Sequence, residues 1–185
     1  MKQLELFEDA DTSYQKTTAD QLKVAIMKSF IEDKGFEIAA TEVHYCDILI
    51  TNLKATPIVE IETKINWYDF LADFDKIKHQ KYLKGEGMIP DFFFFGVPEY
   101  LVDRCQEYLQ KSDYSYYGLI SVSSSGYVHT AMKAKRFPTN SISRQSFFQY
   151  LLKRCTRQLI NLYEEKNEFN SESGCKNLSL GISLI

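Results

Sequence analysis

The sequence predicts an α/β protein with a mixed central sheet flanked by helices on both faces. Apolar runs of strand length alternate with segments of helical periodicity, and their order along the chain is αβββαβαββα. A helix followed by three strands and a crossover helix implies a mixed sheet covered on both sides. With 185 residues, 44% of them hydrophobic and 14% aromatic, the chain has enough apolar bulk for one domain.

The first half contains two predicted helices and three predicted strands. A helix at residues 18–34 has a broad apolar face, Thr18 or Asp20 as its cap, and Gly35 at its end. Strands follow at 36–43, 47–51 and 58–64. Apolar positions at helical spacing then predict one continuous helix at 67–83, ended by the glycine-containing segment 84–87.

The second half begins with a buried strand at 91–97, because four consecutive phenylalanines leave neither face polar. A helix at 99–111 follows Pro98, a hairpin at 116–122 and 127–132 comes next, and a long helix spans 143–165. We therefore expect a flexible arm at 1–16, one domain at 17–166 and a polar tail at 167–185. Alternating apolar residues at 178–184 could pair as a further strand.

Charge and targeting signals narrow the function classes. No run of about 18 apolar residues predicts a membrane span, and the acidic N-terminus lacks the apolar region of a signal peptide. Four scattered cysteines without an export signal favour a reduced, cytoplasmic protein. Residues 1–113 hold 13 basic and 21 acidic side chains, whereas 114–163 hold seven basic and none acidic. This division fits a cation-dependent enzyme acting on a polyanion, or it is a chance segregation of surface charge.

A group of ionisable residues lies on and beside the third predicted strand. Glu60, Glu62 and Lys64 alternate along it and therefore share one face. Three such side chains on a central strand are unfavourable without partners. A Mg²⁺ ion (or Mn²⁺) held by Asp47, Glu62 and Glu60 would supply one, because hard divalent cations prefer carboxylate oxygens. The alternative is a solvated strand face with a Glu–Lys ion pair.

Phosphodiester hydrolysis is the chemistry that suits this set. A metal bound by Asp47 and Glu62 would polarise a phosphate and activate a water. Lys64 would position or deprotonate that water, or stabilise the charge that develops on the phosphate. Glu60 could be a further metal ligand, or could pair with a base from the following helix.

These residues resemble a known family. Asp47, followed by Glu62-Thr63-Lys64, is similar to the D…(D/E)-x-K signature of the PD-(D/E)XK nuclease superfamily. More narrowly, residues 58–73, including the D-F-x-x-D string Asp69 to Asp73, resemble the MmcB-like DNA repair nucleases, and the resemblance spans about 20–135. It implies a restriction-endonuclease-like core, DNA as substrate and a homodimer as one assembly. Cys46 stands where many members have proline, and for the helical acid of many members only Asp20 or Glu32 is a candidate.

Further residues are expected to contact substrate. The helix after the motif offers Lys78, Gln80, Lys81 and Tyr82, of which any could reach a phosphate, although a plain basic helix face is the alternative. The basic residues after the hairpin are candidates for contacts with the phosphates of the DNA backbone; they are Lys133, Lys135 and Arg136. Asp69 and Asp73 are one turn apart and could form a metal site, but we interpret them as an exposed helix face, with Asp69 capping or bonding the preceding turn through Asn66. His44 and His79 are interpreted as ordinary surface or core histidines.

The N-terminal peptide suggests a partner. Gln3, Leu4, Leu6 and Phe7 resemble the Q-L-x-L-F peptide with which bacterial DNA-metabolism proteins dock on the replicative sliding clamp. A flexible arm would present Leu6 and Phe7 to an apolar pocket. Coincidence, or packing on the protein's own surface, are the alternatives. Two functions follow: a Mg²⁺-dependent DNA nuclease in repair, recombination or phage replication, or a non-catalytic module of the same fold that binds DNA or protein.

Overall fold

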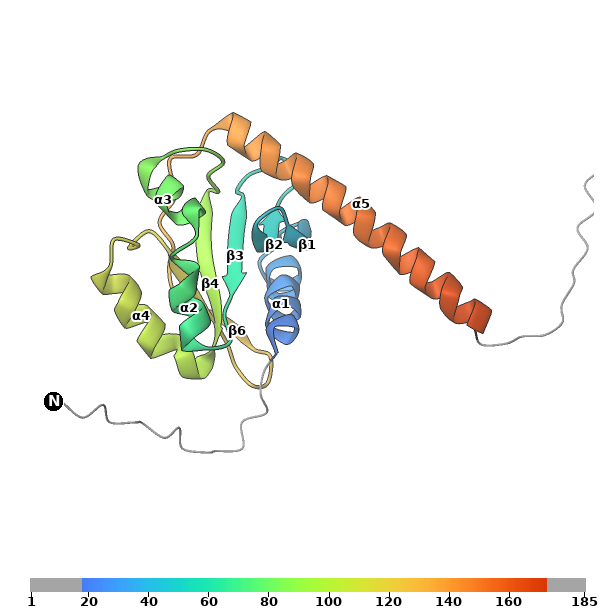
Figure 1. Cartoon of the computed structure of the whole chain (residues 1–185), viewed down its shortest axis with the longest axis horizontal. Coiled ribbons are helices and arrows are strands. Elements are labelled where there is room, and N and C mark those ends of the chain that lie inside the picture. The colour runs from blue at the N-terminus through green and yellow to red at the C-terminus, as the bar shows by residue number, and fades with distance from the viewer. Residues whose placement is uncertain (1–17, 173–185) are drawn as a thin grey trace, which may run out of the picture.

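A six-stranded mixed sheet forms the centre of the domain (Figure 1). The computed structural model describes residues 18–172, with side chains to residue 165, so the expected arm with its Gln3–Phe7 peptide and the residues after 172 lie outside it. The strands run in sequence order: β1 (Ile38–Val43), β2 (Cys46–Thr51), β3 (Val59–Thr63), β4 (Phe92–Pro98), β5 (Gly118–Val122) and β6 (Val128–Met132). β3, β4 and β5 are parallel, and the other neighbours are antiparallel. The predicted α/β class with a mixed sheet is confirmed.

One face of the sheet is covered by α1 (Ala19–Lys28), which continues as a π-helical turn, Ser29–Asp33. Thr18 caps it, accepting from the Gln21 N–H while the Gln21 side chain accepts from the Thr18 N–H. Leu22 and Ile26 pack against the apolar residues of β2, β3 and β5 on this face. Gly96 in β4 permits the close approach of α1, because an added Cβ would lie 2.5 Å from Ile26 Cδ1.

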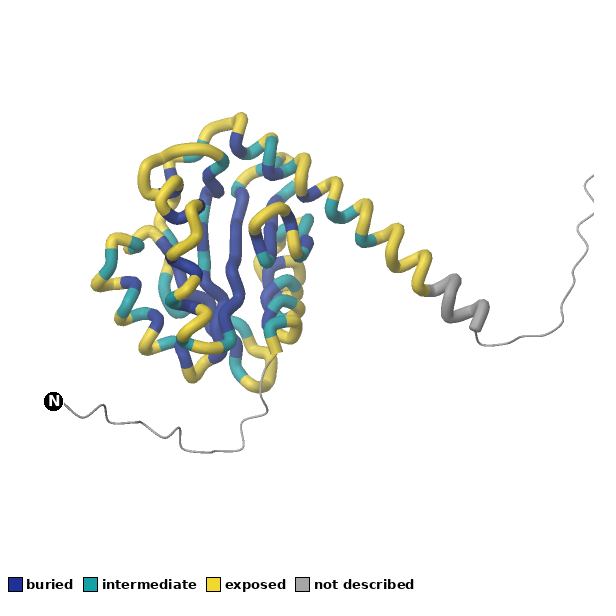
Figure 2. The backbone as a smooth tube through the Cα atoms, in the orientation of Figure 1, coloured by how far each residue is buried: buried dark blue, intermediate teal, exposed yellow. Residues whose placement is uncertain are grey.

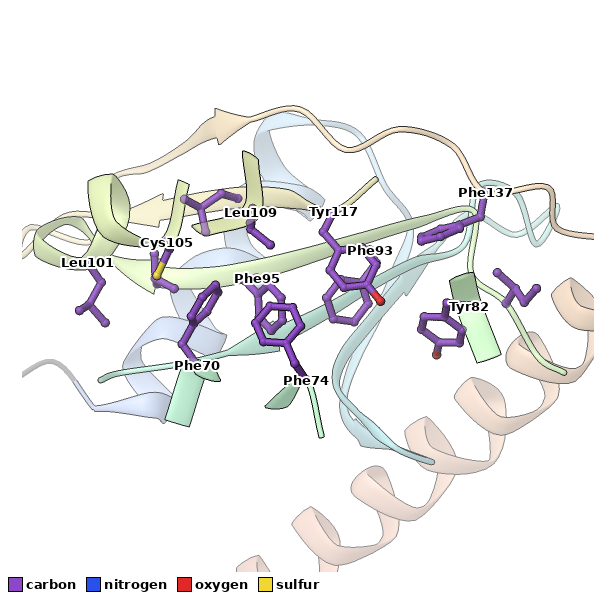
Figure 3. Close-up of a cluster of buried hydrophobic side chains, with 13 residues drawn as sticks. Phe70, Phe74, Tyr82, Phe93, Phe95, Leu101, Cys105, Leu109, Tyr117 and Phe137 are labelled. Carbon is purple, nitrogen blue, oxygen red and sulfur yellow. The ribbon is translucent and has the colours of Figure 1, made fainter. Parts of the chain in front are cut away.

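The opposite face carries the larger core. α2 (Trp67–Asp73), α3 (Ile77–Lys84) and α4 (Val102–Lys111), which follows the 3₁₀ turn Glu99–Leu101, contribute side chains to it. Figure 3 shows its aromatic centre, where Phe70 and Phe74 from α2 meet Phe93 and Phe95 of β4 and Tyr117 before β5. Edge-to-face contacts such as Phe70–Phe95, with ring centroids 4.9 Å apart, join helix to sheet.

The expectation of one helix at 67–83 is wrong, because the chain breaks between α2 and α3. Lys76 is extended, with ψ 133°, and starts a new helix. A continuous helix would carry Ile77 to the face of Phe70 and Phe74, but Ile77 is 67% exposed. The break instead turns His79 and Tyr82 into the core.

The last helix, α5 (Ser141–Glu172), is longer than the expected 143–165 and enters the segment expected as a polar tail. Its first turns pack on the β1–β2 edge through Phe147 and Leu151. Arg154 and Gln158 still contact Thr41 of β1. Figure 1 shows the helix then projecting away from the domain, and residues 159–165 are exposed in Figure 2. Among the helices of residues 18–172, none is long and apolar enough to cross a bilayer.

Candidate active site

Two carboxylates of β3 are buried on the face covered by α3. Glu60 is 0% and Glu62 is 1% exposed, whereas Val59 and Ile61 of the same strand pack toward α1. The alternation predicted for this strand is therefore confirmed. An ionised carboxylate without a partner is costly at such depth, so the surrounding cations decide whether this arrangement is stable.

Lys78 of α3 joins the two carboxylates. Its Nζ lies 2.8 Å from Glu60 Oε1 and 2.5 Å from Glu62 Oε1, and it donates to the Tyr45 carbonyl at 3.1 Å. The Tyr82 hydroxyl donates to the other Glu60 oxygen at 2.7 Å. Of the two alternatives for Glu60, the structure shows the pairing with a base from the following helix. Burial lowers the pKa of Lys78, but Glu60 and Glu62 outweigh it and raise the value above the usual range.

Two further ammonium groups, those of Lys64 and Lys76, contact the other oxygen of Glu62, Oε2. Lys64 Nζ lies 3.2 Å and Lys76 Nζ 3.0 Å from Glu62 Oε2. Both lysines also pair with Asp73 Oδ1, Lys64 at 2.6 Å. Burial raises the pKa of Glu62; Lys78 opposes this, and the charges of Asp73 and Asp47 add to it.

Asp73 belongs to this cluster, although the sequence interpretation placed it on an exposed helix face. Its Oδ2 lies 2.7 Å from His79 Nε2, and His79 Nδ1 lies 2.7 Å from the Tyr117 hydroxyl, all within the core. Burial alone would raise the pKa of Asp73, but the hydrogen bonds from His79 and Lys64 hold it well below its usual range. The available signal was the position of Asp73 three residues after Phe70, on the buried face of α2.

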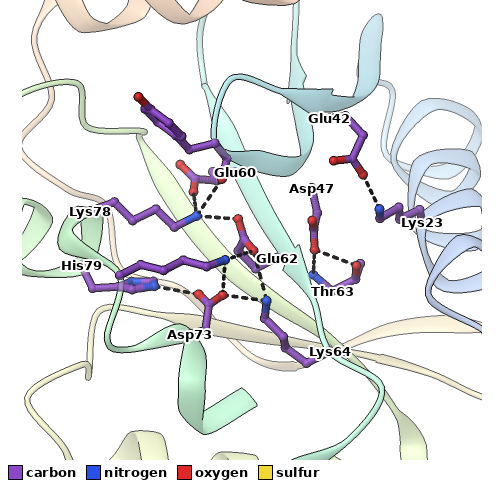
Figure 4. A network of polar contacts seen from close by, with 12 residues as sticks. Lys23, Glu42, Asp47, Glu60, Glu62, Thr63, Lys64, Asp73, Lys78 and His79 are labelled. Atoms are coloured by element: carbon purple, nitrogen blue, oxygen red, sulfur yellow. Dashed lines mark hydrogen bonds and ion pairs between the residues drawn. The ribbon is translucent and has the colours of Figure 1, made fainter. Parts of the chain in front are cut away.

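Asp47 lies at the start of β2, beside the end of β3. Its Oδ2 accepts from the Thr63 backbone N–H at 2.8 Å and from the Thr63 hydroxyl at 2.9 Å. Figure 4 shows Lys64 between Glu62 and Asp73, whereas Asp47 lies apart from them, beside Thr63. A groove of about 350 Å³ opens here, and Asp47, Lys64 and Asp73 are among the residues that line it. Glu62 is buried beside the groove and does not line it, but it contacts Lys64.

The remaining expected substrate contacts divide into two groups. Gln80 and Lys81 are exposed on α3. Lys81, together with Tyr45 and Lys78, lines a second pocket of about 390 Å³. Lys133 and Lys135 are exposed after β6.

Arg136 is engaged with Asp91, which lies just before β4. Asp91 Oδ1 accepts from Arg136 and Arg144 at 2.8 Å each, and its Oδ2 accepts from the Ile58 N–H. Arg136 therefore joins the segment after β6 to the sheet. Asp69 does bond the turn before α2, where its N–H donates to the Asn66 side chain at 2.9 Å.

Carboxylate oxygens at this opening are of the type that Mg²⁺ and Mn²⁺ prefer. Among the residues whose side chains are described, no group of three or more His, Cys, Asp or Glu is arranged to hold a metal ion. The convergence of Glu62 Oε2 and Asp73 Oδ1 on two ammonium groups nevertheless marks a position that holds positive charge. Of these two ammonium groups, that of Lys76 is the more exposed, with 47% of its side chain accessible against 11% for Lys64.

Comparison with known proteins supports the fold alone. No protein-family model matches the chain, and no curated protein matches it. A solved structure, the SPO1766 protein of unknown function from Silicibacter pomeroyi, is similar over 84% of this chain and 96% of its own, with a TM-score of 0.57 and 20% identity. The mixed sheet with its flanking helices is thus shared with a protein whose function is not known.

Proposed function

We propose that this protein is a Mg²⁺- or Mn²⁺-dependent nuclease that hydrolyses phosphodiester bonds in DNA, in repair, recombination or phage DNA metabolism. The observation that supports the proposal is that Asp47 and Lys64 line one groove, between the start of β2 and the end of β3, and that Lys64 Nζ lies 3.2 Å from Glu62 Oε2. Asp73, which the sequence interpretation placed on an exposed helix face, adds a carboxylate to the groove. An opening with acids and an ammonium group is what metal-assisted attack on a phosphodiester requires.

Each residue has a role that follows from its contacts. Asp47 and Glu62 would hold the ion, which supplies a polarised phosphate and an activated water. Lys64 lies 3.2 Å from Glu62 Oε2, close enough to orient that water or to stabilise the charge developing on the phosphate. Lys78 already pairs with Glu60 and with Oε1 of Glu62, so its role is to position the carboxylates rather than to contact substrate.

The route of the DNA strand is part of the same proposal. Lys133 and Lys135 are exposed and could meet backbone phosphates, although Lys135 Nζ lies 5.5 Å from the centroid of the Tyr116 ring, whereas Arg136 is held by Asp91. The peptide Gln3–Phe7 would deliver the enzyme to the bacterial sliding clamp. Loss of salt-sensitive DNA binding in a Lys133→Gln, Lys135→Gln variant would support the route.

Plasmid nicking with Mg²⁺ or Mn²⁺ tests the activity. Wild type should cut, and Lys64→Ala should cut at least about 100-fold more slowly, as expected for removal of a group that stabilises the transition state. Lys84→Ala is the matched control, because Lys84 is an exposed lysine on α3 that belongs neither to the cluster nor to the expected substrate contacts. Circular dichroism and thermal unfolding must show that Lys64→Ala is folded. Equal cutting by Lys64→Ala and wild type would remove the proposed role.

A second candidate is a non-catalytic module that binds DNA or protein. The observation in its favour is that Glu60, Glu62 and Asp73 are each paired with lysine, so the cluster is stable as a purely structural network. Absence of cutting by the wild type with either metal, together with measurable DNA binding, would favour this alternative.

A further inference from the structure

The pocket of about 390 Å³ lies between α3 and the turn that joins β1 to β2. Its wall is largely apolar and aromatic, with Tyr45 from the turn, Ile77 from α3 and Phe147 from α5. The core does not account for two of these residues, because Tyr45 is 72% and Ile77 67% exposed. A mostly apolar hollow of this size with a few polar groups is typical of a site for a small organic group.

The charges of this wall favour an anionic ligand. Among the described residues, those that line the pocket include Lys76, Lys78 and Lys81 but no acid. Lys76 and Lys78 are paired with the buried carboxylates of Glu62 and Glu60. Lys81 is exposed, and its ammonium group forms no ion pair with the side chains that the structure describes. Lys81 is therefore the cation of this wall that can meet a negative charge on a ligand.

Tyr45 is suited to stacking because its turn is held in place. The turn consists of two residues, since Val43 and Cys46 on either side of it are paired in the sheet. The ring centroid of His44 lies 3.8 Å from that of Tyr45 and 4.4 Å from that of Tyr150 in α5. A platform that is already fixed loses little conformational freedom when a ligand binds to it.

The pocket adjoins the groove of the candidate active site. Lys76 lines both openings, and two consecutive residues of β2 line one each, Cys46 the pocket and Asp47 the groove. A ligand with a phosphate in the groove can therefore place a neighbouring group in the pocket. In a strand of DNA that group is a base, which presents a flat face to an aromatic side chain and is linked to phosphates on either side.

We propose that the pocket binds an unpaired base of the DNA strand that enters the groove, stacked on Tyr45, with Lys81 contacting a phosphate next to that base. The inference rests on the proposed nuclease function and adds that the substrate is single-stranded or locally unpaired. A base within a duplex reaches such a pocket only after it is unpaired and unstacked, which is unfavourable. Stacking accepts every base, so the site selects unpaired DNA without selecting its sequence.

Fluorescence anisotropy of the full chain with labelled probes in EDTA measures binding without metal-dependent cutting. The probes are oligothymidylate of about 15 nucleotides, an abasic deoxyribose-phosphate chain of the same length, and a duplex. Wild type should bind oligothymidylate about tenfold more tightly than the abasic chain, which has the same charge, and more tightly than the duplex. Lys81→Gln should reduce the slope of log affinity against log salt by about 0.7 for oligothymidylate.

Substitutions of Tyr45 separate stacking from general attraction. Tyr45→Ala should bind oligothymidylate and the abasic chain equally, whereas Tyr45→Phe should keep the wild-type difference. Tyr45→Ala retains the backbone carbonyl that accepts from Lys78, so the buried cluster keeps this contact. Tyr163→Ala is the matched control, because Tyr163 is 69% exposed on α5 and does not line the pocket, and it should bind as wild type does.

The outcomes distinguish this proposal from the nuclease proposal. Equal binding of oligothymidylate and the abasic chain by wild type, or a preference that persists in Tyr45→Ala, would overturn the base site even if plasmid is cut. A Tyr45-dependent preference in a protein that does not cut would support the base site and remove the nuclease function. No binding of any probe at tens of micromolar would overturn the base site and leave the pocket for an acidic segment of another protein.

Discussion

Replacement of Lys78 by methionine tests the electrostatic account of the cluster. Methionine keeps the length of the side chain but removes the ammonium group that lies 2.8 Å from Glu60 and 2.5 Å from Glu62. Two carboxylates exposed by 1% or less then share one buried region without their common partner. Breaking a buried ion pair from one side costs about 3–5 kcal/mol, because the remaining charge stays desolvated. For a domain of this size, the loss corresponds to a fall in melting temperature of roughly 6–20 °C.

The same variant should respond to pH in a defined direction. Burial already raises the pKa of Glu62, and Lys78 is the main group that opposes this, so its loss raises the pKa further. A carboxyl whose folded pKa exceeds its unfolded value destabilises the fold as the pH rises through that range. The deficit of Lys78→Met should therefore be largest at pH 7 and should shrink toward pH 5.

Urea unfolding of wild type and Lys78→Met at both pH values measures this. Lys81→Met is the matched control, because Lys81 is exposed on the same helix and should change the free energy of unfolding by less than about 0.5 kcal/mol. A deficit below about 1 kcal/mol for Lys78→Met, or one that does not change with pH, would show that Glu60 and Glu62 are not held as charged groups by Lys78.

Three further predictions follow from the cluster and from the Asp91 network. Lys76→Ala should bind Mn²⁺ about fivefold more tightly, as measured by isothermal titration calorimetry. The ammonium group that competes with the ion for Glu62 and Asp73 is then absent, and such a pair contributes roughly 1 kcal/mol. Unchanged affinity would place the ion elsewhere. Wild type should lose stability below about pH 4, because the lowered pKa of Asp73 contributes stability that disappears when the carboxylate is protonated. In urea unfolding, Asp73→Asn should lose less stability over the same pH range. Parallel curves of unfolding free energy against pH for the two proteins would contradict this. Asp91→Asn should lower the free energy of unfolding by about 2 kcal/mol through its contacts with Arg144, whereas a neutral result would mean that this network is replaceable.

The sheet and most helix positions could be predicted because the local signals agree with the final packing. The alternation of β3 placed Val59 and Ile61 opposite Glu60 and Glu62, and the four phenylalanines marked β4 as buried on both faces. The break between α2 and α3 could not be found in this way. Ile77 has the spacing of a residue on a continuous core face, but it is exposed, and the next residue, Lys78, is buried instead. Lys78 pairs with the acids of β3, a contact between residues distant in sequence that helical periodicity does not reveal.

The strand residues of the cluster were named from the sequence, but its helix residues only in part: Lys78 and Tyr82 were expected as substrate contacts and instead bind the acids, and Lys76 was not considered. Asp47, Glu62 and Lys64 were found because strand periodicity fixes which side chains share a face. Lys76 and Asp73 join them only because the chain turns between α2 and α3, and Asp73 had been interpreted as an exposed residue. Whether a side chain on an amphipathic helix is predicted as buried or exposed depends on its angular position around that helix. Treating α2 and α3 as one helix therefore led to wrong predictions of which of their side chains face the site.

The charge balance of the cluster indicates how a metal ion could enter it. Lys64, Lys76 and Lys78 pair with three carboxylates, those of Glu60, Glu62 and Asp73. The nearby Asp47 accepts from Thr63 instead, so the seven residues together carry one net negative charge. Adding a divalent ion to the intact set would give a net positive buried region, whereas exchanging it for one ammonium group would make the region neutral. Lys76 is the one suited to exchange, because its side chain is 47% exposed while those of Lys64 and Lys78 are at most 11% exposed. Its ammonium can regain water on release, which reduces the desolvation cost that the other two would retain.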